Sequence, residues 1–235
     1  QDIVASLYNR NSLCDIIEKT AKEVFIPIIV GGGIRTIDDI CKILRSGADK
    51  VVINTAAVNN PNFISEAAKM FGSSTIAISI ETIKQSNNEY LAYTDNGREF
   101  TGIKAIDWAK KIEDLGAGEI ILTSVDNEGT GRGFDTEIIN SLADEINIPL
   151  VIHGGAGKLS HFKDLLNNTN NIDGIAIASI LHYAPKKFDL TQEDYEFEGN
   201  TEFLNRNTTN SLFEDQTVQS IKDFLILNKV NCRNE

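Results

Sequence analysis

Two short apolar segments of this chain each run from an Ile-Pro pair into a cluster of glycines. The first is Ile26-Pro27-Ile28-Ile29-Val30-Gly31-Gly32-Gly33, and the second is Ile148-Pro149-Leu150-Val151-Ile152-His153-Gly154-Gly155. Each is followed by a helical pattern and a second apolar run, and these second runs end in Val52-Ile53-Asn54-Thr55 and Ala176-Ile177-Ala178-Ser179. The chain is therefore an internally duplicated array of strands and helices with two equivalent glycine-rich strand ends.

The glycine clusters predict sites for anions. Because glycine has no Cβ, its backbone N–H groups approach an anion closely at the start of a helix. A single glycine pair would favour a tight turn without a ligand. Two matched clusters, each beside a second strand that ends in small residues, favour phosphate instead. We therefore expect a ligand with a phosphate at each end.

Strand-like apolar runs alternate with helical patterns along most of the chain. The strand-like runs are 2–4, 28–30, 51–54, 75–81, 119–124, 150–153 and 175–179, and the helical patterns are 12–24, 37–46, 61–71, 103–115, 136–146, 160–166 and 217–228. The strands are apolar throughout, which is typical of parallel strands covered on both faces. The order predicts an α/β fold, a (βα)8 barrel forming one domain over residues 1–235. A doubly wound sheet gives no reason for two glycine clusters half a chain apart.

Two segments interrupt the alternation of strands and helices. Residues 89–93 and 98–100 predict a short hairpin around the turn Asp95-Asn96-Gly97. Residues 186–215 are polar, rich in Asn and Glu and poorly periodic, and predict an insertion or mobile loop. We expect this loop to be solvated surface rather than a site for a partner.

Composition limits the class of function. The formal net charge of −12 argues against nucleic acid as a partner, because lysine and arginine drive that binding. Cys14, Cys41 and Cys232 are widely spaced, without a CxxC pair, and predict thiols of a reducing compartment rather than disulfides or a metal site. No apolar run reaches the roughly 20 residues that cross a bilayer, and the start of the chain shows no signal-peptide pattern. We expect a cytoplasmic enzyme without a cofactor, a metal or a membrane partner.

A set of motifs, in this order and spacing, resembles the cyclase subunit of imidazole glycerol phosphate synthase, the HisF family. The resemblance covers nearly the whole chain except residues 186–215. The motifs are the segments 26–34, 47–57, 116–126, 129–130, 154–158 and 230–233.

The resemblance implies a barrel that binds a long substrate with a phosphate at each end. In the family, ammonia from a HisH-like glutaminase subunit passes through the barrel. The cyclase then uses this ammonia to convert phosphoribulosyl formimino aminoimidazole carboxamide ribonucleotide to imidazole glycerol phosphate and aminoimidazole carboxamide ribonucleotide, a step of histidine biosynthesis. The implied phosphate-binding residues are Gly33, Asn54 and Thr55 for one end of the substrate and Gly129, Gly154, Gly155, Ala178 and Ser179 for the other.

The resemblance also implies a glutaminase-binding face at the opposite end of the barrel. Lys50 and Glu119 match charged residues that gate ammonia there, and Asp49 matches a position that faces the glutaminase. Ordinary surface charge at strand starts is the alternative. An inward-facing Lys–Glu pair would be costly without a purpose, so we expect the gate.

The predicted catalytic residues depart from the family. An aspartate on the fifth strand is replaced by Glu81, and another in the loop after the sixth strand is replaced by Glu128. Glutamate keeps the carboxylate but moves it outward, and a shift on the order of 1 Å can cost about a hundredfold in rate. A further catalytic aspartate belongs to the first strand. Because Asp2 matches the aspartate ending the second strand, we expect about one and a half βα units, on the order of 45 residues, to be absent from this sequence.

These departures leave other functions open. Relatives of the cyclase in surface-polysaccharide biosynthesis are thought to channel ammonia to a separate amidating enzyme, which requires the gate but not the cyclase carboxylates. A phosphosugar-binding barrel without catalysis gives no role to Lys50 and Glu119. His153 replaces a family serine, and it is equally consistent with a hydrogen-bonded strand end and a phosphate-binding imidazolium. We expect His161 and His182 to be structural.

Overall fold

The computed structural model describes residues 14–182 and 212–233 of the 235-residue chain. The strand predicted at residues 2–4, and Asp2 with it, lie outside these ranges. The same holds for residues 186–211 of the predicted insertion.

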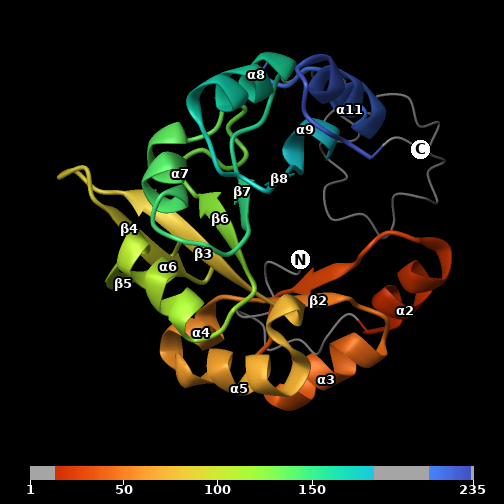
Figure 1. Ribbon diagram of the computed structural model, residues 1–235, viewed down its shortest axis with the longest axis vertical. Helices are drawn as coiled ribbons and strands as arrows, with labels where there is room; N and C mark the ends of the chain where they lie inside the picture. Colours follow the sequence, from red (N-terminus) through yellow and green to blue (C-terminus); the bar gives the residue numbers. More distant parts are fainter. Residues whose placement is uncertain (1–13, 183–211, 234–235) are drawn as a thin grey trace.

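Six parallel strands form one curved sheet in the order β1-β2-β3-β6-β7-β8 (Figure 1). Helices cover its outer side, and the sheet follows the wall of a half-barrel. This arrangement confirms the predicted α/β fold in the form of a partial (βα)8 barrel. The strands are β1 Ile29–Gly31, β2 Lys50–Ile53, β3 Ile76–Lys84, β6 Glu119–Ser124, β7 Leu150–His153 and β8 Gly174–Ala176.

Amphipathic helices lie before, between and after the parallel strands. Two of them begin with capping boxes, in which a threonine hydroxyl accepts from the third helical N–H: Thr36 from Asp39 and Thr217 from Ser220. No helix in residues 14–182 and 212–233 is long and apolar enough to cross a membrane. The helices are α2 Cys14–Glu23, α3 Ile37–Arg45, α4 Thr55–Asn59, α5 Asn62–Phe71, α6 Ala105–Asp114, α7 Thr136–Ala143, α8 Leu159–Asn168, α9 Ser179–His182 and α11 Val218–Leu227, with a 3-10 turn at Ser73–Thr75.

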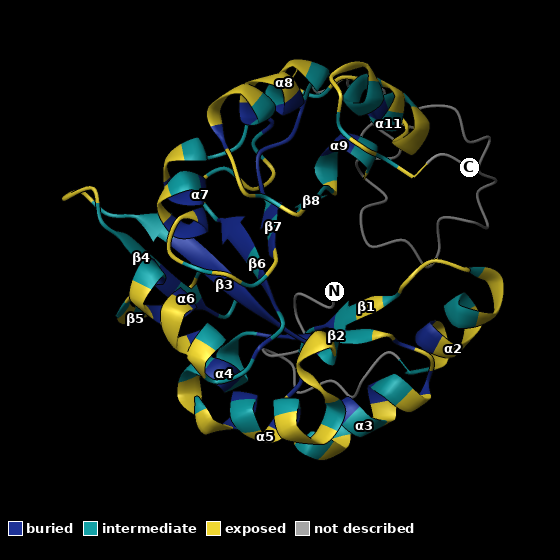
Figure 2. Cartoon of the chain, viewed as in Figure 1, coloured by how far each residue is buried: buried dark blue, intermediate teal, exposed yellow. Residues whose placement is uncertain are grey.

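The two faces of the sheet differ in chemistry. Successive residues of a strand point to opposite faces. One set joins the main apolar cluster with the helices, and Ile78, Ile120 and Ile152 of this set are 0 % exposed. Figure 2 shows β3 and β6 largely in the dark blue of buried residues. The alternate set faces the inside of the half-barrel and carries polar groups, among them Glu81 and Thr123. The inner face is therefore where chemistry is available.

The internal repeat extends to a hydrogen bond outside the glycine clusters. The Asp49 carboxylate accepts from the N–H of Ile28 at 2.7 Å, and the Asp173 carboxylate accepts from the N–H of Leu150 at 2.9 Å. In both pairs the aspartate N–H also donates back to the same partner's carbonyl, at 2.8 and 2.9 Å. Both aspartates precede a strand and both partners follow an Ile-Pro pair, so each aspartate joins two neighbouring strands at their N-terminal ends.

The predicted hairpin is present, and it forms part of a longer antiparallel extension. β3 continues to Lys84 and pairs with β4 Tyr90–Thr94, which pairs with β5 Glu99–Lys104. Because β5 reaches Lys104, α6 begins at Ala105, two residues after its predicted start.

Two local predictions are wrong in detail. The run 175–179 is not strand throughout, because β8 ends at Ala176 and Ser179 begins α9. The short helix α4 directly after β2 was not predicted, because five residues give too little periodicity. The last part of the predicted insertion is packed: Glu214 N–H donates to the Gly157 carbonyl at 2.8 Å.

Candidate active site

The first glycine cluster and the end of β2 form one wall of a cavity of about 210 Å³. Gly32 and Gly33 follow β1 with φ of 105° and 67°, a backbone region that favours glycine. Asn54 and Thr55 follow the neighbouring strand. Three of the predicted phosphate residues, Gly33, Asn54 and Thr55, therefore line the same cavity.

Glu81 reaches this cavity from the inner face of β3 and is 7 % exposed. Its Oε2 accepts a hydrogen bond of 2.8 Å from the N–H of Gly97. Burial raises the pKa of the Glu81 carboxyl above its ordinary value of 4.5, and the Gly97 N–H and the Asn54 side chain partly oppose this by bonding the charged form. The negative charges of Glu128 and Asp95 raise the pKa further. A buried carboxyl that holds its proton more tightly suits acid–base chemistry.

The turn between β4 and β5 lies over the cavity. Asp95, Asn96 and Gly97 all have positive φ, of 51°, 61° and 74°. The Thr55 hydroxyl contacts both the carboxylate and the N–H of Asp95 at 3.4 Å, and the Asn54 side chain donates to the Tyr93 carbonyl at 3.3 Å. We call the residues predicted to bind the first phosphate, Gly33, Asn54 and Thr55, the first cradle. The hairpin is thus hydrogen-bonded both to this cradle and to Glu81.

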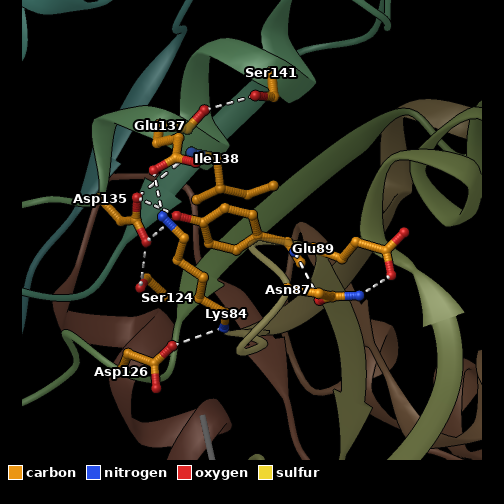
Figure 3. A network of polar contacts seen from close by, with 10 residues as sticks. Lys84, Asn87, Glu89, Ser124, Asp126, Asp135, Glu137, Ile138 and Ser141 are labelled. Atoms are coloured by element: carbon orange, nitrogen blue, oxygen red, sulfur yellow. Dashed lines mark hydrogen bonds and ion pairs between the residues drawn. The ribbon is translucent and has the colours of Figure 1, made fainter.

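The far end of the hairpin is held by a second polar network (Figure 3). Lys84 donates through its backbone N–H to Asp126 at 2.8 Å and through Nζ to Glu137 at 2.6 Å. The Tyr90 hydroxyl lies 3.0 Å from both carboxylate oxygens of Asp135, which also accepts from Ile138 N–H and so caps α7. This network ties the hairpin to the loop after β6 and to α7, which fixes where the Gly97 turn lies.

The second glycine cluster is packed more closely than the first. Gly154 and Gly155 follow β7 with φ of 103° and 101°. A Cβ on Gly155 would lie 1.9 Å from the Gly133 carbonyl oxygen, and one on Gly154 would lie 2.7 Å from that of Ser124. Here glycine is required by the packing of the fold itself, whatever the ligand.

A small hollow of about 10 Å³ lies beside the second glycine cluster. We call the residues predicted to bind the second phosphate the second cradle. All five of these residues line the hollow, together with Glu128 and His153. These five are Gly129, Gly154, Gly155, Ala178 and Ser179. Since β1 and β7 are parallel members of one sheet, both cradles lie at the carboxyl ends of the strands, the usual site of chemistry in this fold.

The predicted gate residues lie at the opposite ends of the strands. Lys50 begins β2 and Glu119 begins β6, and their side chains form an ion pair through Glu119 Oε2. Glu119 is 7 % exposed, and its buried Oε1 has no hydrogen-bond partner within the described part of the chain. Asp49 is exposed beside them and bonded to Ile28.

Several residues around the cavities were not predicted. Ser79, Asp95, Asn96 and Arg35 line the first cavity. The sequence carried a signal for Arg35, since this cationic residue lies only two positions after Gly33. Of the histidines, His161 accepts from Gly157 N–H at 3.2 Å, and burial lowers its pKa. No group of three potential metal ligands occurs in residues 14–182 and 212–233.

Comparison with known proteins places this chain in a family. The family described as "Histidine biosynthesis protein" matches residues 1–186. The imidazole glycerol phosphate synthase subunit HisF of Legionella pneumophila is 53 % identical over 161 residues, which are 68 % of this chain and 76 % of that protein. The HisF subunits of Alkaliphilus metalliredigens and Pyrococcus furiosus are each 44 % identical over 182 residues, 77 % of this chain and 72 % and 71 % of theirs. The chain therefore belongs to the HisF family, the cyclase subunits of imidazole glycerol phosphate synthase.

Proposed function

We propose that this protein is the cyclase-type subunit of a glutamine amidotransferase. It uses ammonia from a HisH-like glutaminase to convert phosphoribulosyl formimino aminoimidazole carboxamide ribonucleotide to imidazole glycerol phosphate and aminoimidazole carboxamide ribonucleotide. The observation that carries the proposal is the position of Glu81. Its buried carboxyl lies on the inner face of the half-barrel, in a cavity walled by the first glycine cluster.

The two cradles suit a substrate with two phosphates. Gly33 and Thr55 offer backbone N–H groups and a hydroxyl at the first cavity, and Gly129 and Ser179 offer the same groups at the second hollow. The two cavities differ in size, about 210 against 10 Å³. The first therefore has room for a sugar phosphate, whereas the second must widen to accept the other phosphate.

Glu81 and Glu128 are the proposed catalytic residues, in different surroundings. Glu81 is buried with a raised pKa, so it holds a proton more tightly than an exposed carboxyl does. Glu128 is exposed in the loop after β6 and lines the second hollow. We assign proton transfer at the reacting centre to Glu81. Glu128 contributes negative charge near it, which favours the protonated form of Glu81.

The Lys50–Glu119 ion pair supports delivery of ammonia from the amino ends of the strands. Among residues 14–182 and 212–233, one buried carboxylate oxygen of Glu119 has no hydrogen-bond partner. Burial of such an oxygen costs free energy, and folding alone gives no reason for that cost. We propose that the pair gates ammonia and that Asp49 and Lys50 belong to the face that binds the glutaminase.

Ammonia transfer is the direct test. The native protein should form imidazole glycerol phosphate when ammonium is supplied at high concentration and pH. With glutamine as the nitrogen source, it should do so only when a glutaminase subunit from the same genome is added. Absence of turnover under both conditions would remove the cyclase assignment.

A second candidate is an ammonia-channelling barrel that serves the amidation of a sugar in surface-polysaccharide biosynthesis. Two observations together favour it. The Lys50–Glu119 pair is present, and positions 81 and 128 carry glutamate where the cyclase family has aspartate. Such a protein would bind and activate a glutaminase but would leave the formimino ribonucleotide unchanged. The two assays above therefore separate the candidates.

A further inference from the structure

One row of polar side chains crosses three adjacent strands at the cavity end of the half-barrel. Glu81 of β3 is the register partner of Thr123 of β6, and Thr123 is the register partner of His153 of β7. Register partners in a parallel sheet lie side by side with their side chains on the same face. Since Glu81 lines the first cavity and His153 the second hollow, this common face is the inner one.

Within this row, Glu81 and His153 flank the path between the two cradles. Neighbouring strands are about 4.8 Å apart, so two steps separate the Glu81 and His153 backbones by roughly 10 Å. Thr123 lies between them, and its hydroxyl is 3.3 Å from Nδ1 of His153. A substrate with a phosphate in each cradle would pass its central atoms over this row.

His153 also has the chemistry that Glu81 lacks. An imidazole changes its protonation between about pH 5 and 8, so its neutral form is an effective base near neutrality. A hydrogen bond from Nδ1–H to the Thr123 hydroxyl would leave Nε2 with a lone pair for the substrate. Thr123 is buried, so this bond also fixes the orientation of the ring.

We propose that His153 is a second acid–base residue of the site, which works as the base opposite Glu81 as the acid. The assignment rests on the proposed cyclase function. In the step that expels the carboxamide ribonucleotide, the nitrogen supplied as ammonia bonds to the formimino carbon, and the bond from that carbon to the leaving nitrogen breaks. His153 takes one proton from the attacking nitrogen, and Glu81 gives one proton to the leaving nitrogen. Transfer of the proton from His153 to Glu81 through solvent restores both groups, and the enzyme's proton count is unchanged after one turnover.

The charged groups that the described residues place near His153 are carboxylates. Glu128 lines the same hollow, and Glu81 lies two strands away on the same row. On the other side, the register partner in β8 is Ala176, which carries no charge. A general base must carry a free lone pair, so kcat should rise with pH over the range in which an imidazole ordinarily changes its protonation.

The test compares His153→Gln and His153→Ser with His161→Gln in the ammonium-dependent cyclase assay. His161 is a matched control, because it is a histidine held by Gly157 away from the row. We expect both His153 variants to lose about 10²- to 10⁴-fold in kcat, with KM changed less than about threefold. The acidic limb of the kcat–pH profile should disappear, and imidazole added to His153→Ala should restore part of kcat. His161→Gln should keep wild-type values.

Other results would overturn the assignment. A rise of KM by tenfold or more with kcat retained would make His153 a phosphate contact instead. An unchanged pH profile in folded His153 variants, or no loss of kcat, would make it structural. Failure of the cyclase proposal itself has a different signature, since the wild-type protein would then show no turnover and the inference would fall with it. Thermal unfolding of every variant shows whether the fold is kept.

Discussion

The backbone N–H of Gly97 donates a hydrogen bond of 2.8 Å to Oε2 of Glu81, and so joins the hairpin turn to the buried carboxyl of β3. Burial favours the neutral form of that carboxyl, whereas this hydrogen bond favours its charged form. The protonation of Glu81 therefore depends on where the turn lies. The turn is held at the other end of the hairpin by Lys84 and Tyr90.

The first prediction concerns the stability of Glu81→Gln. Because the pKa of Glu81 is raised above 4.5 in the folded protein, the folded state binds this proton more tightly than the unfolded chain does. The stabilising contribution is complete below pH 4.5 and is lost as pH rises through the folded pKa. Glutamine does not titrate and still accepts from Gly97. Thermal unfolding between pH 4 and 8 should show Glu81→Gln gaining stability relative to wild type as pH rises.

Glu89→Gln provides a control of opposite sign. Its pKa is lowered, chiefly by hydrogen bonds from Lys104 and Asn87, so Glu89 adds stability above its ordinary pKa of 4.5. Its variant should lose a little stability relative to wild type as pH rises. If Glu81→Gln followed the same direction as Glu89→Gln, the pKa of Glu81 would not be raised in the folded protein.

A second prediction concerns activity and separates the two candidate functions. As a cyclase, Glu81→Gln should lose about 10² to 10⁴ in kcat with ammonium, because general acid–base catalysis contributes that much. In an ammonia-channelling subunit the same substitution should leave amidation nearly unchanged. In that case Lys50→Ala should disturb the coupling between glutamine hydrolysis and amidation. Initial rates with ammonium and with glutamine, measured for both variants, distinguish these outcomes.

The third prediction contrasts two glycines of the second cradle. In Gly155→Ala the new Cβ would lie 1.9 Å from the Gly133 carbonyl oxygen, so backbone must move. In Gly129→Ala, at φ 70°, nothing lies within 4 Å of the new Cβ. We expect losses in the free energy of unfolding of about 3 kcal/mol or more for Gly155→Ala and about 1–2 kcal/mol for Gly129→Ala. Denaturant unfolding measures both, and equal losses would contradict the packing of this turn.

The sequence predicted the parts of the fold that depend on local pattern. The parallel strands follow from apolar runs such as Val51–Ile53, and the hairpin follows from the turn Asp95-Asn96-Gly97. The short helices were harder, because α4 and α9 have only five and four residues. Ser179 was consequently predicted in a strand, although it begins a helix.

Site residues could be predicted from the sequence where they lie at the end of a single strand. Contacts between two elements could not be predicted. Gly33 and Asn54 stand at strand ends, and their position follows from the strand order. The contact of Gly97 with Glu81 depends on the register of β3 against β4, which no local pattern encodes. Asp95 lines the first cavity because of the same register between β3 and β4. The row of Glu81, Thr123 and His153 likewise required the register of three strands.

The last prediction uses the internal repeat to test the proposed glutaminase face. Asp49 and Asp173 are both exposed and make matching hydrogen bonds to Ile28 and Leu150. Replacement of either by alanine removes one charge-assisted bond, so each should lower the free energy of unfolding by a similar amount, about 1–2 kcal/mol. Only Asp49 is followed by a charged residue, Lys50, whereas Asp173 is followed by Gly174.

We therefore expect glutaminase binding to separate the two variants. In titrations with the glutaminase subunit, Asp49→Ala should raise Kd about tenfold or more, and Asp173→Ala should leave it within about twofold. Asp49→Asn keeps an acceptor for Ile28 but loses the charge, so it should recover most of the stability and little of the affinity. Equal Kd values for the two alanine variants would mean that Asp49 serves the strand junction alone, as Asp173 does, and that the partner binds elsewhere.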